Sequence, residues 1–169
     1  MNKEQLPAAL QAQIGQLLGS SEWFTMDQER ITGFGHLTAD PDPMHIDSAW
    51  AKKHSPYGNT IAFGFLTISM LTAMNHSVID YDREERSGES GFALNYGFDK
   101  LRLLSPVPVG SRIRGHFKMH SVTERDPGEY LIKLDVEVEI EGQERPALAA
   151  EWLSLWVASL DNQRIANRE

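Results

Sequence analysis

The chain has 169 residues, of which 41% are hydrophobic, and this suits one globular domain with a sizeable core. Its 24 acidic residues outnumber the 16 basic ones and give a net charge of −8 at pH 7. That charge argues against a nucleic-acid binder, because such a protein needs a basic face to contact phosphates. The sequence contains no cysteine, which excludes disulfides, thiolate nucleophiles and cysteine-bound metals and fits a reducing cytosol.

Residues 1–20 are predicted to form a short helical extension. Their apolar residues recur at helical spacing: Leu6, Leu10, Ile14, Leu17 and Leu18. The segment lacks the unbroken apolar core of a signal peptide, and the most apolar stretch of the chain, 61–74, is far shorter than the ~20 residues of a membrane span. We therefore expect a cytoplasmic protein that does not enter a membrane, with one domain over 21–160 and a tail over 161–169.

Short elements are predicted between this extension and the apolar stretch. A strand over 21–27 leads to Asp27, a suitable N-cap for a helix that ends near Leu37. Phe34 and Leu37 are expected to face the core from that helix. A proline-bearing loop follows, and a second short helix is expected over 47–54.

From Phe65 onward, the segment 61–79 is apolar or small on nearly every side, which predicts a helix that is buried on most sides. A strand is the rival interpretation, but the length of the segment and the lack of glycine or proline after Gly64 favour a helix. A charged, glycine-bearing loop is expected over 80–91.

The remainder of the chain is predicted to form four long strands. In "KLDVEVEIE" hydrophobic residues alternate with charged ones, and "SRIRGHFKMH" repeats this pattern. The predicted inward-facing residues are Leu134, Val136, Val138, Ile140, Ile113, Phe117 and Met119. In "GFALNYGFDKLRLLS" the apolar phase changes near Asp99, which predicts a bulge, and "ALAAEWLSLWVASL" is apolar on both faces. A buried helix followed by four strands with short connections predicts an α+β fold in which an antiparallel sheet curves around that helix.

The stretch "TADPDPMHID" places Asp40 and His45 on a loop that two prolines stiffen. An aspartate and a histidine can divide proton transfer between them, one accepting a proton while the other donates one. Spacing alone favours a simpler interpretation, since Asp and Pro are ordinary turn residues. In that interpretation Asp40, Asp42 and Asp47 cap or end helical turns, and His45 is a loop histidine.

Two further features also have a functional and a simpler interpretation. Gly64 begins the buried helix, where free backbone N–H groups could hold an oxyanion, or it serves the turn and close packing. Five basic residues on predicted strands could receive the phosphates of an anionic ligand, although the solvated face of a sheet is the commoner explanation. They are Lys100, Arg102, Arg112, Arg114 and Lys118. The sequence has no serine-hydrolase elbow, phosphate-binding loop, dinucleotide fingerprint or H-E-x-x-H metal motif.

Two stretches resemble a known family. "TADPDPMHID…AKKHSPYGNTIAFGFLTISML" resembles the motif of the MaoC-like (R)-specific enoyl-CoA hydratases, written D-x-N-P-x-H-x-D and then I-A-H-G-[FM]. "LNYGFDKLRLLSPVPVGSRIRG" resembles the NodN-like branch of that family. The resemblance covers roughly residues 20 to 157. It implies the hot-dog fold, in which a curved antiparallel sheet wraps a long helix, and a homodimer.

The resemblance also assigns roles to individual residues. Asp40 would be the base that acts on the water attacking C3 of an enoyl thioester, and His45 would position that water and deliver a proton to C2. The backbone N–H of Gly64 would stabilise the thioester oxygen. Further substrate-binding residues are predicted at Phe63, Asn95, Lys100 and Arg102.

The sequence departs from the family motif at two positions, because Asp42 replaces its asparagine and Phe63 replaces its second histidine. The two changes predict a weakened or retuned activity rather than none, because the backbone N–H of Gly64 survives both of them. The implied reaction is the reversible hydration of trans-2-enoyl-CoA to (R)-3-hydroxyacyl-CoA. No cofactor, metal or nucleic-acid partner is expected, and coenzyme A is part of the substrate. A non-catalytic acyl-CoA-binding protein and an acyl-CoA thioesterase are the alternatives.

Overall fold

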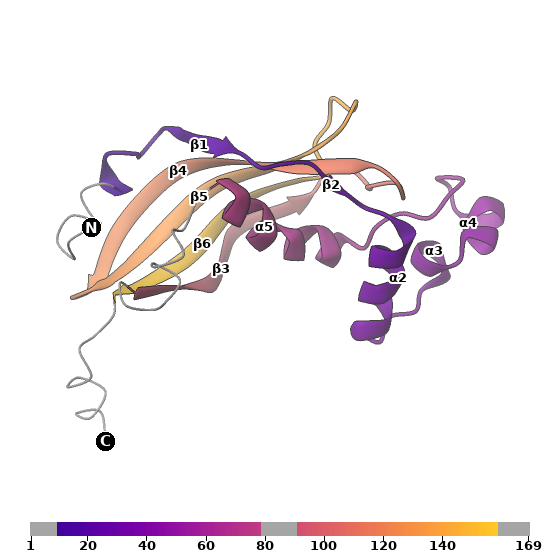
Figure 1. Cartoon of the computed structure of the whole chain (residues 1–169), viewed down its shortest axis with the longest axis horizontal. Coiled ribbons are helices and arrows are strands. Elements are labelled where there is room, and N and C mark those ends of the chain that lie inside the picture. The colour runs from indigo at the N-terminus through magenta and orange to yellow at the C-terminus, as the bar shows by residue number, and fades with distance from the viewer. Residues whose placement is uncertain (1–9, 79–90, 159–169) are drawn as a thin grey trace, which may run out of the picture.

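The computed structural model describes residues 10–78 and 91–158, in which a long helix lies against an arched antiparallel sheet (Figure 1). The elements in chain order are β1 (Leu17–Ser20), β2 (Phe24–Thr25), α2 (Gln28–Leu37), α3 (Pro43–Ile46), α4 (Ser48–His54), α5 (Gly64–Val78), β3 (Gly91–Leu103), β4 (Arg112–Asp126), β5 (Glu129–Ile140) and β6 (Leu148–Ala158). Figure 1 shows α5 along one face of the sheet, with α2, α3 and α4 grouped beyond one end of it. This confirms the predicted α+β architecture.

The sheet follows the order β1-β4-β5-β6-β3, and β2 pairs with the beginning of β4. All of these pairings are antiparallel. The register of β3 against β6 shifts between Phe98 and Lys100, which confirms the bulge predicted near Asp99. A second shift lies between Asn95 and Gly97. Each bulge increases the local bend of the strand.

The core lies between α5 and the face of the sheet that α5 covers. All seven inward-facing residues predicted on the two alternating strands are buried. The helix contributes Leu66, Met70, Leu71 and Met74 to the same cluster, and Trp152 of β6 also belongs to it. The period-two pattern therefore predicted the buried face of β4 and β5 correctly, because one side of each strand packs on the helix and the other meets solvent.

The N-terminal prediction was wrong for part of the described chain. Leu17–Ser20 is strand β1, which pairs with β4 from Leu17 opposite Lys118 to Ser20 opposite His116. The exposed edge of β4 offers unpaired backbone groups, and pairing with it outweighs a weak amphipathic pattern. The sheet therefore begins before the boundary predicted at residue 21. Residues 1–9, the tail 161–169 and nearly all of the loop predicted over 80–91 lie outside the described residues.

Two apolar residues that were expected to be buried are exposed. Leu37, the last residue of α2, is 90% exposed, because Ile31 and Phe34 already occupy the side of α2 that meets the core. Phe65 in the first turn of α5 is 74% exposed. The sheet covers α5 on one side only, so the pattern that predicted a helix buried nearly all round overestimated its burial.

The chain turns sharply where α2 ends, and Gly35 makes that turn possible. The Asp40 N–H donates to the Gly35 carbonyl at 2.9 Å, which brings the following loop back against the helix. A Cβ at Gly35 would lie 2.9 Å from the Asp40 carbonyl oxygen and 3.0 Å from Cζ of Phe63. Ala39 completes the turn with φ 55, in the left-handed region that L residues rarely adopt.

Replacing Ala39 with glycine should stabilise the protein. The left-handed conformation costs an alanine roughly 1–2 kcal/mol, and glycine removes this cost. Part of that gain is lost because glycine has greater conformational freedom in the unfolded chain. We expect Ala39→Gly to raise the free energy of unfolding in urea by up to about 1 kcal/mol. Ala51→Gly, inside α4, is the control and should lower it by about 1 kcal/mol or more. Equal losses at the two positions would contradict the strain at Ala39.

Candidate active site

His45 lies on the one-turn helix α3, whose ends are both held by aspartates. Asp42 is the N-cap and accepts a hydrogen bond from the Met44 N–H at 2.8 Å. Asp47 follows α3 and caps α4. The capping interpretation is therefore correct for Asp42 and Asp47. For Asp40 it is correct only for the backbone: the Asp40 N–H donates to the Gly35 carbonyl in the turn that ends α2 after Leu37, while neither α3 nor α4 uses the Asp40 side chain as its cap.

The imidazole of His45 is held by one short hydrogen bond. Its Nδ1 lies 2.8 Å from the carbonyl oxygen of Ile61. A carbonyl oxygen only accepts, so Nδ1 carries a hydrogen and Nε2 is the ring nitrogen available to other partners. The sequence interval of 16 residues between the two groups means that the contact depends on how α3 packs against the segment before α5.

The Ile61 carbonyl is available because of the way its segment pairs. Ile61 lies opposite Pro108 in an antiparallel bridge. The hydrogen bonds of that bridge belong to the neighbouring residues, from the Ala62 N–H to Val107 and from the Val109 N–H to Thr60. Ile61 is thus the non-hydrogen-bonded member of the pair, and its own carbonyl points away from the partner segment. Proline fits opposite it without loss, since no N–H is needed there.

Phe63 forms the backing of the His45 ring. The ring centroids of Phe63 and His45 are 3.9 Å apart. Phe63 also packs against Phe34, with ring centroids 5.4 Å apart. Phe63 is 4% exposed and is not among the residues that line the adjacent cavity. The structure therefore places this predicted substrate-binding residue behind the histidine, where it restrains the plane of the imidazole ring.

His45 and Gly64 line the same cavity, which has a volume of about 230 Å³. Its other lining residues are Tyr57, Ile61, Ala62, Thr67, Leu103, Leu104, Ser105, Pro106, Val107 and Ala147. Asp40 is exposed and is not part of this lining within the described chain. The structure thus brings two of the three predicted catalytic groups to one cavity and leaves Asp40 on the loop before α3.

Gly64 begins α5 at the wall of this cavity. The Thr67 N–H donates to the Phe63 carbonyl at 3.1 Å, which makes this the first turn of the helix. The first N–H groups of a helix have no partner within it, so they can receive a ligand oxygen. A Cβ at Gly64 would collide with Cδ1 of Leu103, which shows that the strand β3 packs directly over this helix end.

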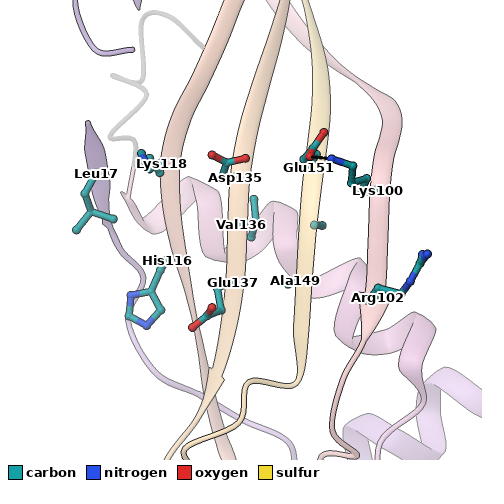
Figure 2. A pocket seen from close by; sticks show the side chains of 11 residues that line it. Leu17, Lys100, Arg102, His116, Lys118, Asp135, Val136, Glu137, Ala149 and Glu151 are labelled. Carbon is teal, nitrogen blue, oxygen red and sulfur yellow. Dashed lines mark hydrogen bonds and ion pairs between the residues drawn. The ribbon is translucent and has the colours of Figure 1, made fainter. Parts of the chain in front are cut away.

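The other predicted substrate-binding residues lie elsewhere. Asn95 faces α5, where its Nδ2 is 3.4 Å from the Thr72 hydroxyl. Lys100 and Arg102 line a broad groove of about 560 Å³ on the opposite face of the sheet, and Figure 2 shows α5 passing behind the strands that carry them. Lys100 forms an ion pair there with Glu151. The hydrogen bond from Lys100 is the main reason that the pKa of the Glu151 carboxyl lies below its usual value.

The remaining basic residues favour the simpler interpretation of a solvated sheet face. Arg112 pairs with Glu141, and Arg114 pairs with Glu139 at 2.6 Å. Both guanidinium groups also stack on the ring of Trp23. The hydrogen bond from Arg114 is the largest influence on Glu139 and lowers the pKa of its carboxyl. Lys118 lines the groove that holds Lys100 and Arg102, on the side away from His45.

Several residues near the site were not predicted. Tyr57 lies in a stretch of turn residues, Leu103 ends a strand, and Gln28 is the first residue of α2. Gln28 donates to the backbone carbonyl of His45 at 2.8 Å. Nothing in the local sequence distinguishes these residues from ordinary turn, strand and helix positions, because their relation to the cavity arises only when distant segments meet.

Within residues 10–78 and 91–158, no helix is both long enough and apolar enough to cross a bilayer. The same ranges hold no group of three or more acidic or histidine side chains that is arranged to bind a metal ion.

Comparison with known proteins agrees with the fold and with the two motifs. The family model of the MaoC like domain matches residues 9–140. Nodulation protein N of Rhizobium leguminosarum bv. viciae is 43% identical over 148 residues, which span 88% of this chain and 89% of that protein. The 3-hydroxyacyl-thioester dehydratase Z of Mycobacterium tuberculosis (strain ATCC 25618 / H37Rv) is 34% identical over 151 residues, or 89% of this chain and 95% of that protein.

A solved structure extends the comparison to the fold. The (R)-hydratase from A. caviae involved in PHA biosynthesis superposes with a TM-score of 0.65 at 18% identity, covering 83% of this chain and 94% of that one. That likeness shows the shared hot-dog fold, while the match over residues 9–140 and the identity to Nodulation protein N show the family. The chain belongs to the MaoC-like domain family, in its nodulation protein N branch.

Proposed function

We propose that this protein catalyses the reversible hydration of trans-2-enoyl-CoA to (R)-3-hydroxyacyl-CoA. The observation that carries the proposal is the cavity in which His45 meets the start of α5. With Nδ1 committed to Ile61, the histidine presents Nε2 as its proton-exchanging atom. A donor for a developing oxyanion, the Gly64 N–H, lines the same small cavity. The dehydratase name of the mycobacterial relative points to the same class of reaction.

In the proposed reaction Asp40 accepts one proton of a water molecule as the water oxygen bonds to C3. The imidazolium form of His45 delivers a proton from Nε2 to C2, and a proton then returns from Asp40 to Nε2 through water. The sum is the addition of one water across the double bond. The Gly64 N–H stabilises the charge that gathers on the thioester oxygen, and a donor of this kind can contribute about 3–4 kcal/mol in the transition state.

The role of Asp40 is supported by what its neighbours do. Asp42 and Asp47 hold the ends of α3 and α4, which leaves the carboxylate of Asp40 outside the capping arrangement. The backbone of Asp40 is fixed against Gly35 at a turn that includes the left-handed Ala39. Unusual backbone conformations of this kind persist where the surrounding structure enforces them and are common at functional sites.

Hydration is tested by following the absorbance of the conjugated thioester of crotonyl-CoA. The protein should remove this absorbance, and Asp40→Asn should lower kcat by about 10²–10⁴-fold, because it removes the general base. The matched control is Asp42→Asn, which keeps a good N-cap and restores the asparagine of the family motif. The control should retain activity of the same order as the parent.

The same experiment separates the alternatives. Release of free coenzyme A thiol without hydration would identify a thioesterase, and saturable binding of crotonyl-CoA without either reaction would identify a binding protein. Equal activity of the parent and Asp40→Asn would remove Asp40 from the mechanism.

We also propose that the protein is a homodimer that joins two copies through β3. Of the described strands, β3 forms one edge of the sheet, where an unpaired strand is open to another chain. Four of its large apolar residues are between 37% and 51% exposed in the single chain: Phe92, Leu94, Tyr96 and Phe98. At the other end of β3, Leu103 packs on Gly64, and both Leu103 and the neighbouring Phe65 of α5 are exposed. Apolar area of this kind on an edge strand is typical of a surface that another chain covers.

Light scattering after gel filtration tests the dimer. We expect twice the chain mass of 19.0 kDa for the parent protein. Phe65→Lys should shift the protein toward the monomer, because it places a charge where an apolar contact is proposed. Leu37→Lys is the control, since Leu37 is also an exposed apolar helix residue but lies in the helical group beyond the sheet. A monomeric parent, or a dimer that both variants leave intact, would contradict the β3 interface.

A further inference from the structure

The side-chain amide of Gln28 contacts two separate parts of the candidate active site. Its Nε2 donates to the backbone carbonyl of His45 at 2.8 Å, and its Oε1 accepts from the Thr60 hydroxyl at 2.6 Å. The second hydrogen on Nε2 points to the Thr32 hydroxyl at 3.0 Å. Because the His45 carbonyl can only accept, the amide has one orientation that satisfies all three contacts.

These contacts form a closed chain of hydrogen bonds that includes His45. Gln28 holds the backbone of His45, the ring of His45 bonds to the Ile61 carbonyl, and Thr60 next to Ile61 bonds back to Gln28. Thr60 is completely buried, and its carbonyl is tied to the Val109 N–H at 3.0 Å. The segment that carries the Ile61 carbonyl is therefore anchored, and Gln28 sets the position of α3 relative to it.

The orientation of His45 depends on that relative position. The imidazole has a hydrogen bond at Nδ1 and an aromatic face against Phe63, both of which come from the segment before α5. If α3 shifts, the Nδ1 contact lengthens and the ring is free to turn. A displacement of about 1 Å in a reacting group can cost on the order of 10²-fold in rate, even when its cause lies outside the reacting atoms.

We propose that Gln28 is a positioning residue for this reaction, which holds His45 in line with its Ile61 partner through the shared contact with Thr60. The inference rests on the proposed hydratase function. Gln28 acts through His45 and is not itself part of the cavity lining in the described chain. Its loss should therefore affect turnover more than substrate binding.

The kinetic test compares three variants that differ in which contact they remove. Gln28→Leu removes both links, and Gln28→Glu keeps an acceptor for Thr60 but loses the donor to the His45 carbonyl. Both should lower kcat for crotonyl-CoA by about 10- to 100-fold while KM changes by less than about twofold. Thr32→Val is the matched control, because it removes a contact to the same Gln28 nitrogen without touching His45. It should keep kcat within about twofold of the parent, since no group at the His45 contact is altered.

A spectroscopic test does not depend on activity. In protein labelled with ¹⁵N-histidine, the Nδ1–H proton of His45 should give a hydrogen-bonded resonance in the parent and in Thr32→Val. That resonance should shift or broaden in Gln28→Leu. Thr60→Val removes the hydrogen bond from the Thr60 hydroxyl to Gln28 with almost no change in side-chain size, and it should have the same effect. It replaces Gln28→Leu in this test if that variant does not fold.

The outcomes separate this inference from the proposed function. An unchanged resonance in folded Gln28→Leu, or parental kcat in Gln28→Glu, would overturn the role of Gln28. A parent protein that fails to hydrate enoyl-CoA but shows the expected resonance changes would refute the hydratase and support the positioning of His45 by Gln28.

Discussion

The hydrogen bond between His45 and the Ile61 carbonyl is the contact on which the arrangement of the site depends. It determines which nitrogen of the imidazole is free, and it joins α3 to the segment that leads into α5. The bond exists because Ile61 pairs with a proline in a non-hydrogen-bonded position, which leaves its carbonyl unused by the sheet. The isolated bridge between Ile61 and Pro108 thus leaves free the acceptor that orients a side chain from another element.

Close packing around this contact leaves little room for change. Gly35 allows the Asp40 loop and Phe63 to approach α2, and Gly64 allows β3 to pack over the beginning of α5. At both positions a Cβ would meet backbone or side-chain atoms at less than ordinary contact distance. Glycine is a poor helix former, so Gly35 and Gly64 each weaken their helix. The packing that they allow between neighbouring segments offsets this loss.

The two faces of the sheet serve different purposes. The face toward α5 is apolar and builds the core, while the opposite face carries ion pairs between neighbouring strands, such as Arg114 with Glu139 and Lys100 with Glu151. Exposed pairs of this kind contribute little to stability, because solvent screens the attraction between their charges. Among the described strands, β3 lies at one edge of the sheet and forms a third kind of surface, because several of its large apolar side chains are exposed.

The sequence by itself determined α2, α4, α5 and the four long strands, the buried faces of β4 and β5, the bulge at Asp99 and the family to which the chain belongs. These follow from local periodicity, capping residues and motifs, all of which lie within short stretches. The sequence did not predict strand β1, and it predicted a loop where α3 lies. The burial of Leu37 and Phe65 was predicted wrongly, because periodicity shows an apolar face but not whether another element covers it. Only the tertiary structure decided the rest.

The packing of the elements decided three features of the site. It placed Lys100 and Arg102 on the opposite face of the sheet from His45, it brought the Ile61 carbonyl to Nδ1, and it put Phe63 behind the imidazole. The physical reason is that the His45 to Ile61 contact joins residues 16 positions apart and the Gln28 to Thr60 contact joins residues 32 positions apart, and no short-range pattern records such a distance.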